Sequence, residues 1–455
     1  MIPFVLLAQM AAAVPPAPLR FGHFGEVAVY RPAVQATATA LFFSGDGGWN
    51  QGVQDMARNL AQSGTLVLGI DTPRFLRALD ASGASCAYLA GEAEALSQFG
   101  QKALGLPAYG PPMLVGYSSG AALVYATLAQ APDNTFLGGV SIGFDPALPM
   151  RTALCERNGL TTTYVPKHRR RIVQPVAHLP APWIVLQGTI DHDWPVDSAA
   201  TFAAAVPGTD FVRLPHVGHG FSEQANWMPQ FKEAVARLAP HDPESAAPPG
   251  LGGLPVIELP DPGDTATDYF AVVLSGDGGW ASLDKQIAQE LVRAGVPVVG
   301  FNSLQYFWNR RTPDESAGDL ERVIRHYQQV FHRQAVVLVG YSRGADVLPL
   351  MVSRLPAGLI ADIRLVALLG LEHQTSLEFR VGDWLGAQPD AAYPLLPEVK
   401  KLQGTRLLCV YGSREKDTLC PALPAGLAEV VRLDGGHHFD GDYRGLAQMV
   451  LAHAR

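Results

Sequence analysis

The sequence has few charged residues, no excess of positive charge and only four cysteines. Charged residues make up 17% of the 455 residues and the formal net charge is −8. The chain therefore lacks the basic face that a nucleic-acid-binding protein normally carries. No apolar run approaches the roughly 20 residues that a membrane-spanning helix needs. The hydrophobic content of 48% excludes a disordered chain, and the length favours two domains over one.

Sequence signatures of cofactors are missing as well. No group of histidines and cysteines has the spacing of metal ligands. The glycine-rich segments SGDGGW lack the Lys-Ser/Thr pair that ends a nucleotide-binding P-loop. The sequence therefore predicts neither a metal nor another cofactor.

The chain opens with an apolar run, MIPFVLLAQMAAAVPPAP, that has no positively charged residue before it. Apart from that missing charge, the run has the apolar core and the small-residue end of a secretory signal peptide, with a cleavage site at residues 11–13. We expect residues 1–19 to be a signal-peptide remnant and leader, and the protein to be exported.

The cysteines fall two in each half of the chain. Disulfides persist in the oxidising compartments that exported proteins reach. We therefore expect the pairs Cys86–Cys155 and Cys409–Cys420. The first pair would close a loop of about 70 residues, and the chain-entropy model assigns such a loop roughly 4 kcal/mol of stabilisation.

Four motifs occur twice in the same order, at offsets between 218 and 231 residues. They are SGDGGW, a Gly-Tyr-Ser-x-Gly-Ala motif, a glycine followed by two acidic positions, and a Gly-His pair followed by Phe. The copies lie at 44–49 and 275–280, at 116–121 and 340–345, at 188–193 and 412–417, and at 218–221 and 436–439. A constant order at a nearly constant offset indicates a tandem duplication.

A segment rich in Pro, Gly and Ala, PHDPESAAPPGLGG, separates the two copies. We expect an N-terminal domain over 20–240, a linker over 241–253 and a C-terminal domain over 254–455. Each copy alternates continuous apolar strands, such as FAVVL at 270–274, with helical segments. Strands of this kind are buried on both faces. The predicted fold class is α/β, with a mostly parallel sheet flanked by helices in each domain.

A G-x-S-x-G motif follows a strand and precedes a helix in both halves, around Ser118 and Ser342. This context is typical of the nucleophile elbow of α/β-hydrolases, which holds the serine on a sharp turn above the sheet. The sequence thus predicts two tandem α/β-hydrolase domains with Ser118 and Ser342 as nucleophiles.

A serine nucleophile needs a histidine base that is oriented by an acid, and in this fold the chain order is Ser, acid, His. We expect His219 and His437, which lie in matching glycine-rich turns, to be the bases.

Each acid loop offers two carboxylates. The repeat aligns Glu415 with Asp191 and Asp417 with Asp193. In the second half we favour Asp417, because the later position is Asp in both halves, with Glu415 as the alternative acid. In the first half we favour Asp191, because a proline four residues later is typical of the hydrolase acid turn, with Asp193 as the alternative.

Backbone N–H groups must stabilise the oxyanion that forms during acyl transfer. One donor is expected from the residue after each serine, Ser119 or Arg343. The other is expected from the SGDGGW loop, where glycine lets the backbone approach the substrate. The loop residues expected to contribute are Asp46 and Gly47 in the first half, and Asp277 and Gly278 in the second.

Two further segments each have two interpretations. The basic run KHRRR at 167–171 could meet anionic lipid head groups or form a solvated face. The aromatic residues of the second half could line an acyl-chain groove or pack in the core. They are Tyr306, Phe307, Trp308, Phe379, Trp384 and Tyr393.

The second half resembles the bacterial virulence protein VirJ family over nearly its whole length. The resemblance is carried by SGDGGW at 275–280, VVGFNSLQYFW at 298–308, GYSRGADVLP at 340–349 and GGHHF at 435–439. The layout of two halves is similar to AcvB, a longer relative whose C-terminal half is VirJ-like.

The resemblance implies a periplasmic serine hydrolase that releases lysine or alanine from the membrane phospholipid aminoacyl-phosphatidylglycerol. It places the family's serine, acid and histidine on Ser342, Asp417 and His437. It also implies a connection with virulence and with type IV secretion components. Two alternatives stay open: a general periplasmic esterase or lipase, and a non-catalytic accessory protein of type IV secretion. The first half could be a second active site, a membrane-docking domain or a relic.

Overall fold

The computed structural model describes residues 19–239, 248, 250–259, 267–280, 282–382 and 392–455. The expected leader, apart from residue 19, and most of the expected linker lie outside the described residues. In the described part of the chain, no helix is long and apolar enough to cross a bilayer.

The first half is built on an eight-stranded sheet, counted over its described residues, with the order β1-β2-β4-β3-β6-β7-β12-β13. Strands from β4 to β13 run parallel, whereas β1 and β2 are antiparallel additions at one edge. The strands are β1 (Leu19–Phe21), β2 (Gly25–Tyr30), β3 (Ala38–Phe43), β4 (Thr65–Ile70), β6 (Met113–Tyr117), β7 (Gly138–Ile142), β12 (Trp183–Gly188) and β13 (Asp210–Leu214).

The second half repeats this sheet without the β1 edge, in the order β14-β16-β15-β17-β18-β21-β22. The edge strand β14 is antiparallel to β16, and the strands from β16 to β22 run parallel. The strands are β14 (Val256–Glu258), β15 (Tyr269–Leu274), β16 (Val298–Phe301), β17 (Ala335–Tyr341), β18 (Ile363–Leu369), β21 (Leu407–Gly412) and β22 (Glu429–Leu433). The matching order confirms the predicted α/β class and its duplication.

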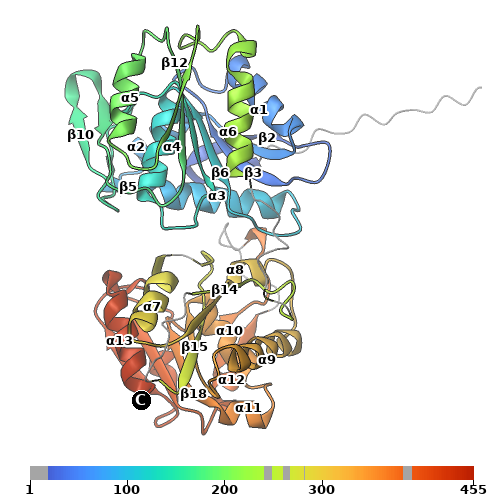
Figure 1. Cartoon of the computed structure of the whole chain (residues 1–455). Coiled ribbons are helices and arrows are strands. Elements are labelled where there is room, and N and C mark those ends of the chain that lie inside the picture. The colour runs from blue at the N-terminus through green and yellow to red at the C-terminus, as the bar shows by residue number, and fades with distance from the viewer. Residues whose placement is uncertain (1–18, 240–247, 249, 260–266, 281, 383–391) are drawn as a thin grey trace, which may run out of the picture.

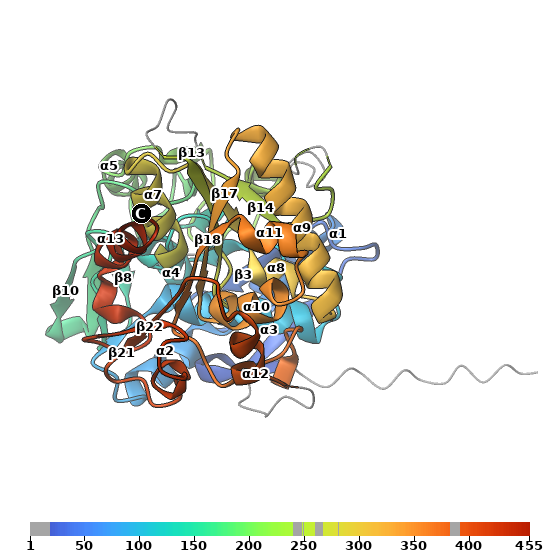
Figure 2. The ribbon, with the colours of Figure 1, turned by 90° about the horizontal axis from the view of Figure 1, so that it is seen from below.

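Helices cover both faces of each sheet, which explains why the strands are continuously apolar. Along β15, Phe270 and Val272 pack into one core cluster while Ala271 and Val273 pack into the cluster on the opposite face. Figure 2 shows α7 and α13 on one side of β17 and β18, with α9, α10 and α11 on the other. The helices are α1 (Gln51–Gln62), α2 (Thr72–Ala81), α3 (Leu89–Ala103), α4 (Ser119–Gln130), α5 (Val196–Ala204), α6 (Met228–Leu238), α7 (Ser282–Arg293), α8 (Ser303–Tyr306), α9 (Pro313–Val330), α10 (Arg343–Val352), α11 (Ala357–Ala361), α12 (Leu395–Lys401) and α13 (Tyr443–His453).

Short strands lie outside the two main sheets. A three-stranded sheet in the order β10-β11-β8 projects from the side of the first half, in the green part of the chain in Figure 1, and its hairpin carries the basic run. The short strands are β5 (Cys86–Ala87), β8 (Ala147–Leu148), β9 (Ala153–Leu154), β10 (Thr162–Val165), β11 (Arg170–Val173), β19 (Gln374–Thr375) and β20 (Tyr393–Pro394).

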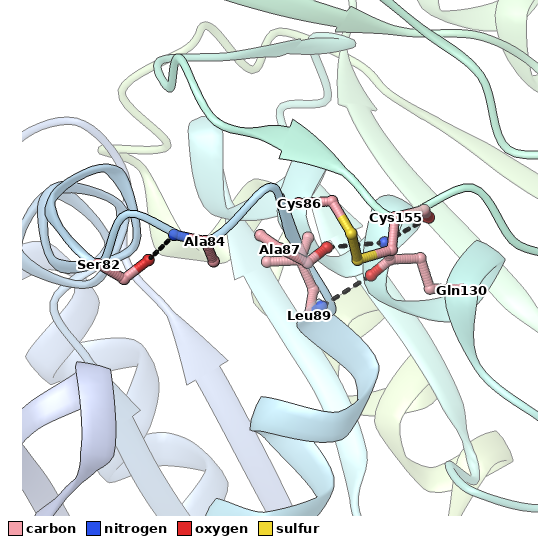
Figure 3. Close-up of a disulfide and its surroundings, with 7 residues drawn as sticks. All are labelled: Ser82, Ala84, Cys86, Ala87, Leu89, Gln130 and Cys155. Carbon is pink, nitrogen blue, oxygen red and sulfur yellow. Dashed lines mark hydrogen bonds between the residues drawn. A yellow bond between two sulfur atoms is a disulfide. The ribbon is translucent and has the colours of Figure 1, made fainter. Parts of the chain in front are cut away.

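Both predicted disulfides are present, Cys86–Cys155 and Cys409–Cys420. The first joins β5 to the segment after β9 (Figure 3). The amide of Gln130 supports this junction, because its nitrogen donates to the carbonyls of Ala87 and Cys155 at 3.0 and 2.9 Å. The crosslink therefore joins β5 to the segment after β9, and Gln130 ties this junction to the end of α4.

We expect the double substitution Cys86→Ala/Cys155→Ala to lower the free energy of unfolding by roughly 2–4 kcal/mol, because the bridge closes a long loop in the unfolded chain. Urea unfolding followed by circular dichroism measures this difference. Cys409→Ala/Cys420→Ala is the comparison, since its residues are 11 apart instead of 69. A smaller loss from the first pair than from the second would contradict the loop-entropy account.

The two halves stack head to tail. The chain after α3 and the loop after α4 lead into β6 and β7, so they lie at the amino ends of the first sheet's strands. These segments meet the second half's carboxyl-end loops, in the region of α7 and α8 (Figure 1). Trp308 donates its indole N–H to the carbonyl of Leu106 at 2.8 Å, and Asn309 donates to the carbonyl of Pro107 at 2.8 Å. Tyr109 of the first half is part of the second half's core cluster.

Candidate active site

Ser118 and Ser342 occupy the sharp turns between β6 and α4 and between β17 and α10. Their φ angles are 56° and 51°, in the left-handed region that side-chain-bearing residues rarely adopt. The turn also needs glycine two residues after each serine. A Cβ on Gly344 would lie 2.2 Å from the carbonyl oxygen of Leu274, and one on Gly120 would lie 2.3 Å from that of Phe43. The strained backbone and the close packing are those of a nucleophile elbow.

In the first half a continuous hydrogen-bonded relay reaches the serine. Ser118 Oγ lies 3.0 Å from His219 Nε2, and His219 Nδ1 lies 2.9 Å from Asp191 Oδ2. The Asp191 carboxylate is fully buried and also accepts the backbone N–H groups of Asp193 and Trp194. These bonds fix the carboxylate on the imidazole nitrogen that must keep its proton.

The alternative acid of the first half, Asp193, does not have this position. Its side chain is 74% exposed, and its Oδ2 lies 3.7 Å from His219 Nε2, the nitrogen that faces the serine. From there it cannot orient the ring through Nδ1. The geometry agrees with the choice of Asp191.

In the second half the structure corrects the predicted acid. His437 Nδ1 lies 2.5 Å from Glu415 Oε1, and Glu415 Oε2 accepts the backbone N–H of Gly412. Asp417, the favoured residue, is exposed. The prediction was wrong because it favoured the later acidic position on the ground that this position is Asp in both halves. The repeat aligns Glu415 with Asp191, and it is this earlier position that faces the histidine.

The pKa shifts agree with a histidine that is held by this carboxylate. The hydrogen bond that His437 donates to Glu415 raises the pKa of His437, and burial opposes this shift only in part. Burial raises the pKa of Glu415, but the hydrogen bonds from His437 and from the Gly412 N–H outweigh it, so the net pKa is lowered. The pair therefore favours a charged carboxylate beside a basic imidazole.

Ser342 and His437 are close neighbours, although no hydrogen bond joins Ser342 Oγ to the ring. The backbone N–H of Ser342 donates to Leu369 at 2.8 Å. A Cβ on the next residue, Gly370, would lie 2.8 Å from His437 Cε1. Catalytic hydrogen bonds are often long without substrate and tighten in the Michaelis complex.

His438, the other histidine of the second turn, binds elsewhere. Its Nδ1 lies 2.9 Å from the hydroxyl of Tyr341. Burial lowers its pKa, and the neighbouring His437 lowers it further. This position agrees with the choice of His437 as the base.

The expected oxyanion loops pass directly against the nucleophiles, one residue before the predicted donors. A Cβ on Gly45 would lie 3.1 Å from Ser118 Cβ, and one on Gly276 would lie 3.5 Å from Ser342 Cβ. Gly45 and Gly276 were not singled out from the sequence, although they belong to the repeated motif. The peptide groups that follow them belong to the predicted residues Asp46 and Asp277, whose role stays a prediction, as does that of Gly47, Gly278, Ser119 and Arg343.

The Arg343 side chain has a further role that its motif did not reveal. Its guanidinium donates to the carbonyl and hydroxyl of Ser376 at 2.9 and 3.2 Å, and it lies 4.7 Å from the ring centre of Phe379. It thereby anchors the segment beside the second nucleophile. The first half has Ser119 at this position, and the buried Ser119 hydroxyl has no hydrogen-bond partner.

The basic run divides between two environments. Lys167, His168 and Arg169 are exposed at the hairpin between β10 and β11. Arg170 reaches back toward the first site, where its guanidinium lies 3.6 Å from Asp46 and 3.8 Å from Asp145. One cation of the run therefore borders the loop beside Ser118.

The aromatic segment of the second half lies in its core. Tyr306, Phe307 and Trp308 are each at most 2% exposed. Phe379 is also buried, and Tyr393 is half-buried against the same cluster. Trp384 lies outside the described residues. For Phe307 and Trp308, core packing is the correct interpretation, whereas the buried Tyr306 also lines a cavity between the two halves.

Comparisons with known proteins agree with this geometry. A family model described as bacterial virulence protein (VirJ) matches residues 37–136 and 268–455, more than half of the chain. The match includes Ser118 and the complete second site, but it does not include Asp191 or His219. No curated protein matches the chain.

Similar solved structures each correspond to about half of the chain. XC6422 from Xanthomonas campestris, described as an α/β serine hydrolase without lid, is 22% identical, with 50% of this chain and 96% of that one covered and a TM-score of 0.35. The esterase domain of a Rhodothermus marinus protein is 20% identical, with 47% and 92% covered and a TM-score of 0.31. An α/β serine hydrolase homologue from Coxiella burnetii is 17% identical, with 47% and 91% covered and a TM-score of 0.32. The α/β fold of each half is shown by its strand order and its elbow.

Proposed function

The chain belongs to the bacterial virulence protein (VirJ) family, and we propose that it is a periplasmic serine esterase that cleaves the aminoacyl ester of aminoacyl-phosphatidylglycerol. The observation that carries the proposal is the arrangement of serine, histidine and carboxylate at each of two nucleophile elbows. The two disulfides support a location in an oxidising compartment.

The reaction would proceed by acyl transfer through the serine. Ser342 Oγ attacks the ester carbonyl while His437 Nε2 takes the hydroxyl proton and Glu415 stabilises the imidazolium. Backbone N–H groups of the elbow and of the glycine-rich loop stabilise the oxyanion. Collapse of this intermediate expels the phosphatidylglycerol hydroxyl, which receives the proton from His437. Water, deprotonated by the same histidine, then releases the free amino acid.

Charge near the second site supports an aminoacyl substrate. An aminoacyl ester carries an ammonium group next to its carbonyl. Asp277 follows Gly276, which lies against Ser342. Asp277 and Glu372 both raise the pKa of His437 electrostatically, although burial raises the pKa of Glu372 itself. Carboxylates in this place attract a cationic acyl group and disfavour an anionic one.

We expect the purified protein to release lysine or alanine from vesicles that contain lysyl- or alanyl-phosphatidylglycerol, with phosphatidylglycerol as the second product. Mass spectrometry of both products measures this. Ser118→Ala/Ser342→Ala is the control and should release neither amino acid. Hydrolysis of p-nitrophenyl butyrate without release of an amino acid would indicate a general esterase. Activity on neither substrate would leave the accessory role in type IV secretion.

A further inference from the structure

A cavity of about 1060 Å³ lies where the two halves meet. The first half contributes Glu94, Ala108 and Tyr109 to its wall, and the segment at 250–257 forms another part. The second half contributes the glycine-rich loop after β15 and residues of and around α8. We call this space the junction cavity. Its size is that of a small-molecule site.

The junction cavity begins where the oxyanion loop of the second site ends. Gly276 lies against Ser342, and Gly278 and Gly279, two and three residues later, line the cavity. A Cβ on Gly279 would lie 3.4 Å from Leu304 Cβ, and Leu304 lines the cavity too. A molecule in the cavity is therefore one short loop away from the second nucleophile.

The walls combine apolar surface with one cation. Tyr109, Leu254, Leu304 and Tyr306 are buried residues that line the cavity. Arg311 lines it as well, with its guanidinium 4.8 Å from the ring centre of Tyr306 and 3.4 Å from the Tyr306 carbonyl. Within the described chain no carboxylate forms an ion pair with Arg311, although Glu315 interacts with it electrostatically, so its guanidinium can still donate to an anion that enters.

Glu94, the acidic residue in the cavity wall, does not repel an anion at neutral pH. Burial and the nearby Asp277 raise the pKa of Glu94 to about 8. Glu94 is therefore mostly uncharged at pH 7.

We propose that the junction cavity binds the glycerol-phosphate and the adjoining acyl chains of the lipid ester, with its phosphodiester on Arg311 and its aminoacyl carbonyl at Ser342. This inference rests on the proposed function and extends it. The apolar walls fit the acyl chains, and the Arg311 guanidinium, which the Tyr306 carbonyl and ring hold in place, fits the phosphodiester. It gives the first half a role as one wall of the second half's substrate site. In the first half Ser118 lies at the carboxyl ends of the strands, which is the end of the sheet opposite the junction.

The proposal is tested by measuring lipid binding to a protein that cannot turn over an ester. We expect the Ser118→Ala/Ser342→Ala protein to bind water-soluble dihexanoyl-phosphatidylglycerol at one site, as measured by isothermal titration calorimetry below the micelle concentration. Adding Ala108→Trp should weaken binding at least tenfold, because the indole fills space that the lipid needs. Adding Arg311→Gln should weaken it roughly tenfold or more, the usual size of a lost charge-assisted hydrogen bond. Arg311→Lys should recover part of the loss.

The matched control is Ala236→Trp, which places the same indole on the exposed face of α6 and should leave the affinity unchanged. Circular dichroism and the thermal midpoint check that each variant is folded, and if Ala108→Trp unfolds, the two Arg311 variants decide. Absence of saturable binding, or equal affinity in Ala108→Trp and its parent, would overturn the proposal. Binding here with no cleavage of aminoacyl-phosphatidylglycerol would refute the proposed function alone.

Discussion

Ser342→Ala should remove hydrolysis of aminoacyl-phosphatidylglycerol while leaving hydrolysis of a small soluble ester at the first site. Loss of a triad nucleophile typically costs on the order of 10⁴- to 10⁶-fold in turnover. The soluble ester survives as a substrate because Ser118, His219 and Asp191 form a complete relay. The lipid does not, because among the described residues the junction cavity is lined by the glycine-rich loop of the second site and not by that of the first. Turnover of lysyl-phosphatidylglycerol vesicles and of p-nitrophenyl acetate measures the two activities.

Ser118→Ala is the matched substitution in the other half. It should lower lipid hydrolysis by a few-fold at most, while removing the part of the soluble-ester activity that Ser342→Ala leaves. Equal losses of lipid hydrolysis in the two variants would mean that both sites act on the lipid. The reverse ranking would contradict the assignment of the second site as the lipid hydrolase.

Glu415→Gln should lower kcat of the second site by on the order of 10³- to 10⁴-fold, the size seen when the acid of a triad becomes an amide. The amide can no longer hold the imidazole in the required tautomer. The measurement is made in Ser118→Ala protein, so that only the second site turns over. Asp417→Asn is the control and should change kcat less than threefold, because Asp417 is exposed and not bonded to His437. A large loss in Asp417→Asn with little in Glu415→Gln would restore the acid that the sequence favoured.

Glu415→Gln should also change the pH dependence of the second site. The base must be neutral, so kcat/KM rises as pH passes through the pKa of His437. Glu415 raises that pKa. Removing its charge should therefore lower the pKa of His437 and move the acidic limb of the profile to lower pH. A limb that stays in place in Glu415→Gln would mean that another group sets it.

Local sequence determined much of this molecule. The continuous apolar strands imply sheets that are covered on both faces, and the duplicated motifs imply the same sheet twice. The elbow could be predicted because its strained turn depends on glycines two residues before and after the serine, as the close packing of Gly120 and Gly344 shows. The cysteine pairs followed from two cysteines in each half of a chain whose first residues predict export.

The triad acid depended on tertiary structure. Glu415 and Asp417 are two residues apart in one loop, and sequence alone does not say which of them faces the imidazole. That depends on the path of the loop beyond β21 and on the Gly412 N–H that holds the carboxylate. Asp occupies the later position in both halves, as Asp193 and Asp417. This identity was misleading because both side chains are exposed.

The sequence by itself thus determined the two folds, the serine and the histidine of each site, and the crosslinks, because each depends on short-range patterning or on a repeated motif. The tertiary structure alone decided which carboxylate holds His437 and where Arg170 reaches. It also decided that the amino ends of the first sheet's strands lie against the carboxyl-end loops of the second half. The junction cavity belongs to this second group. Its walls come from α3, from the segment before β14 and from α8. No sequence pattern joins these segments, and only the packing of the two halves brings them together.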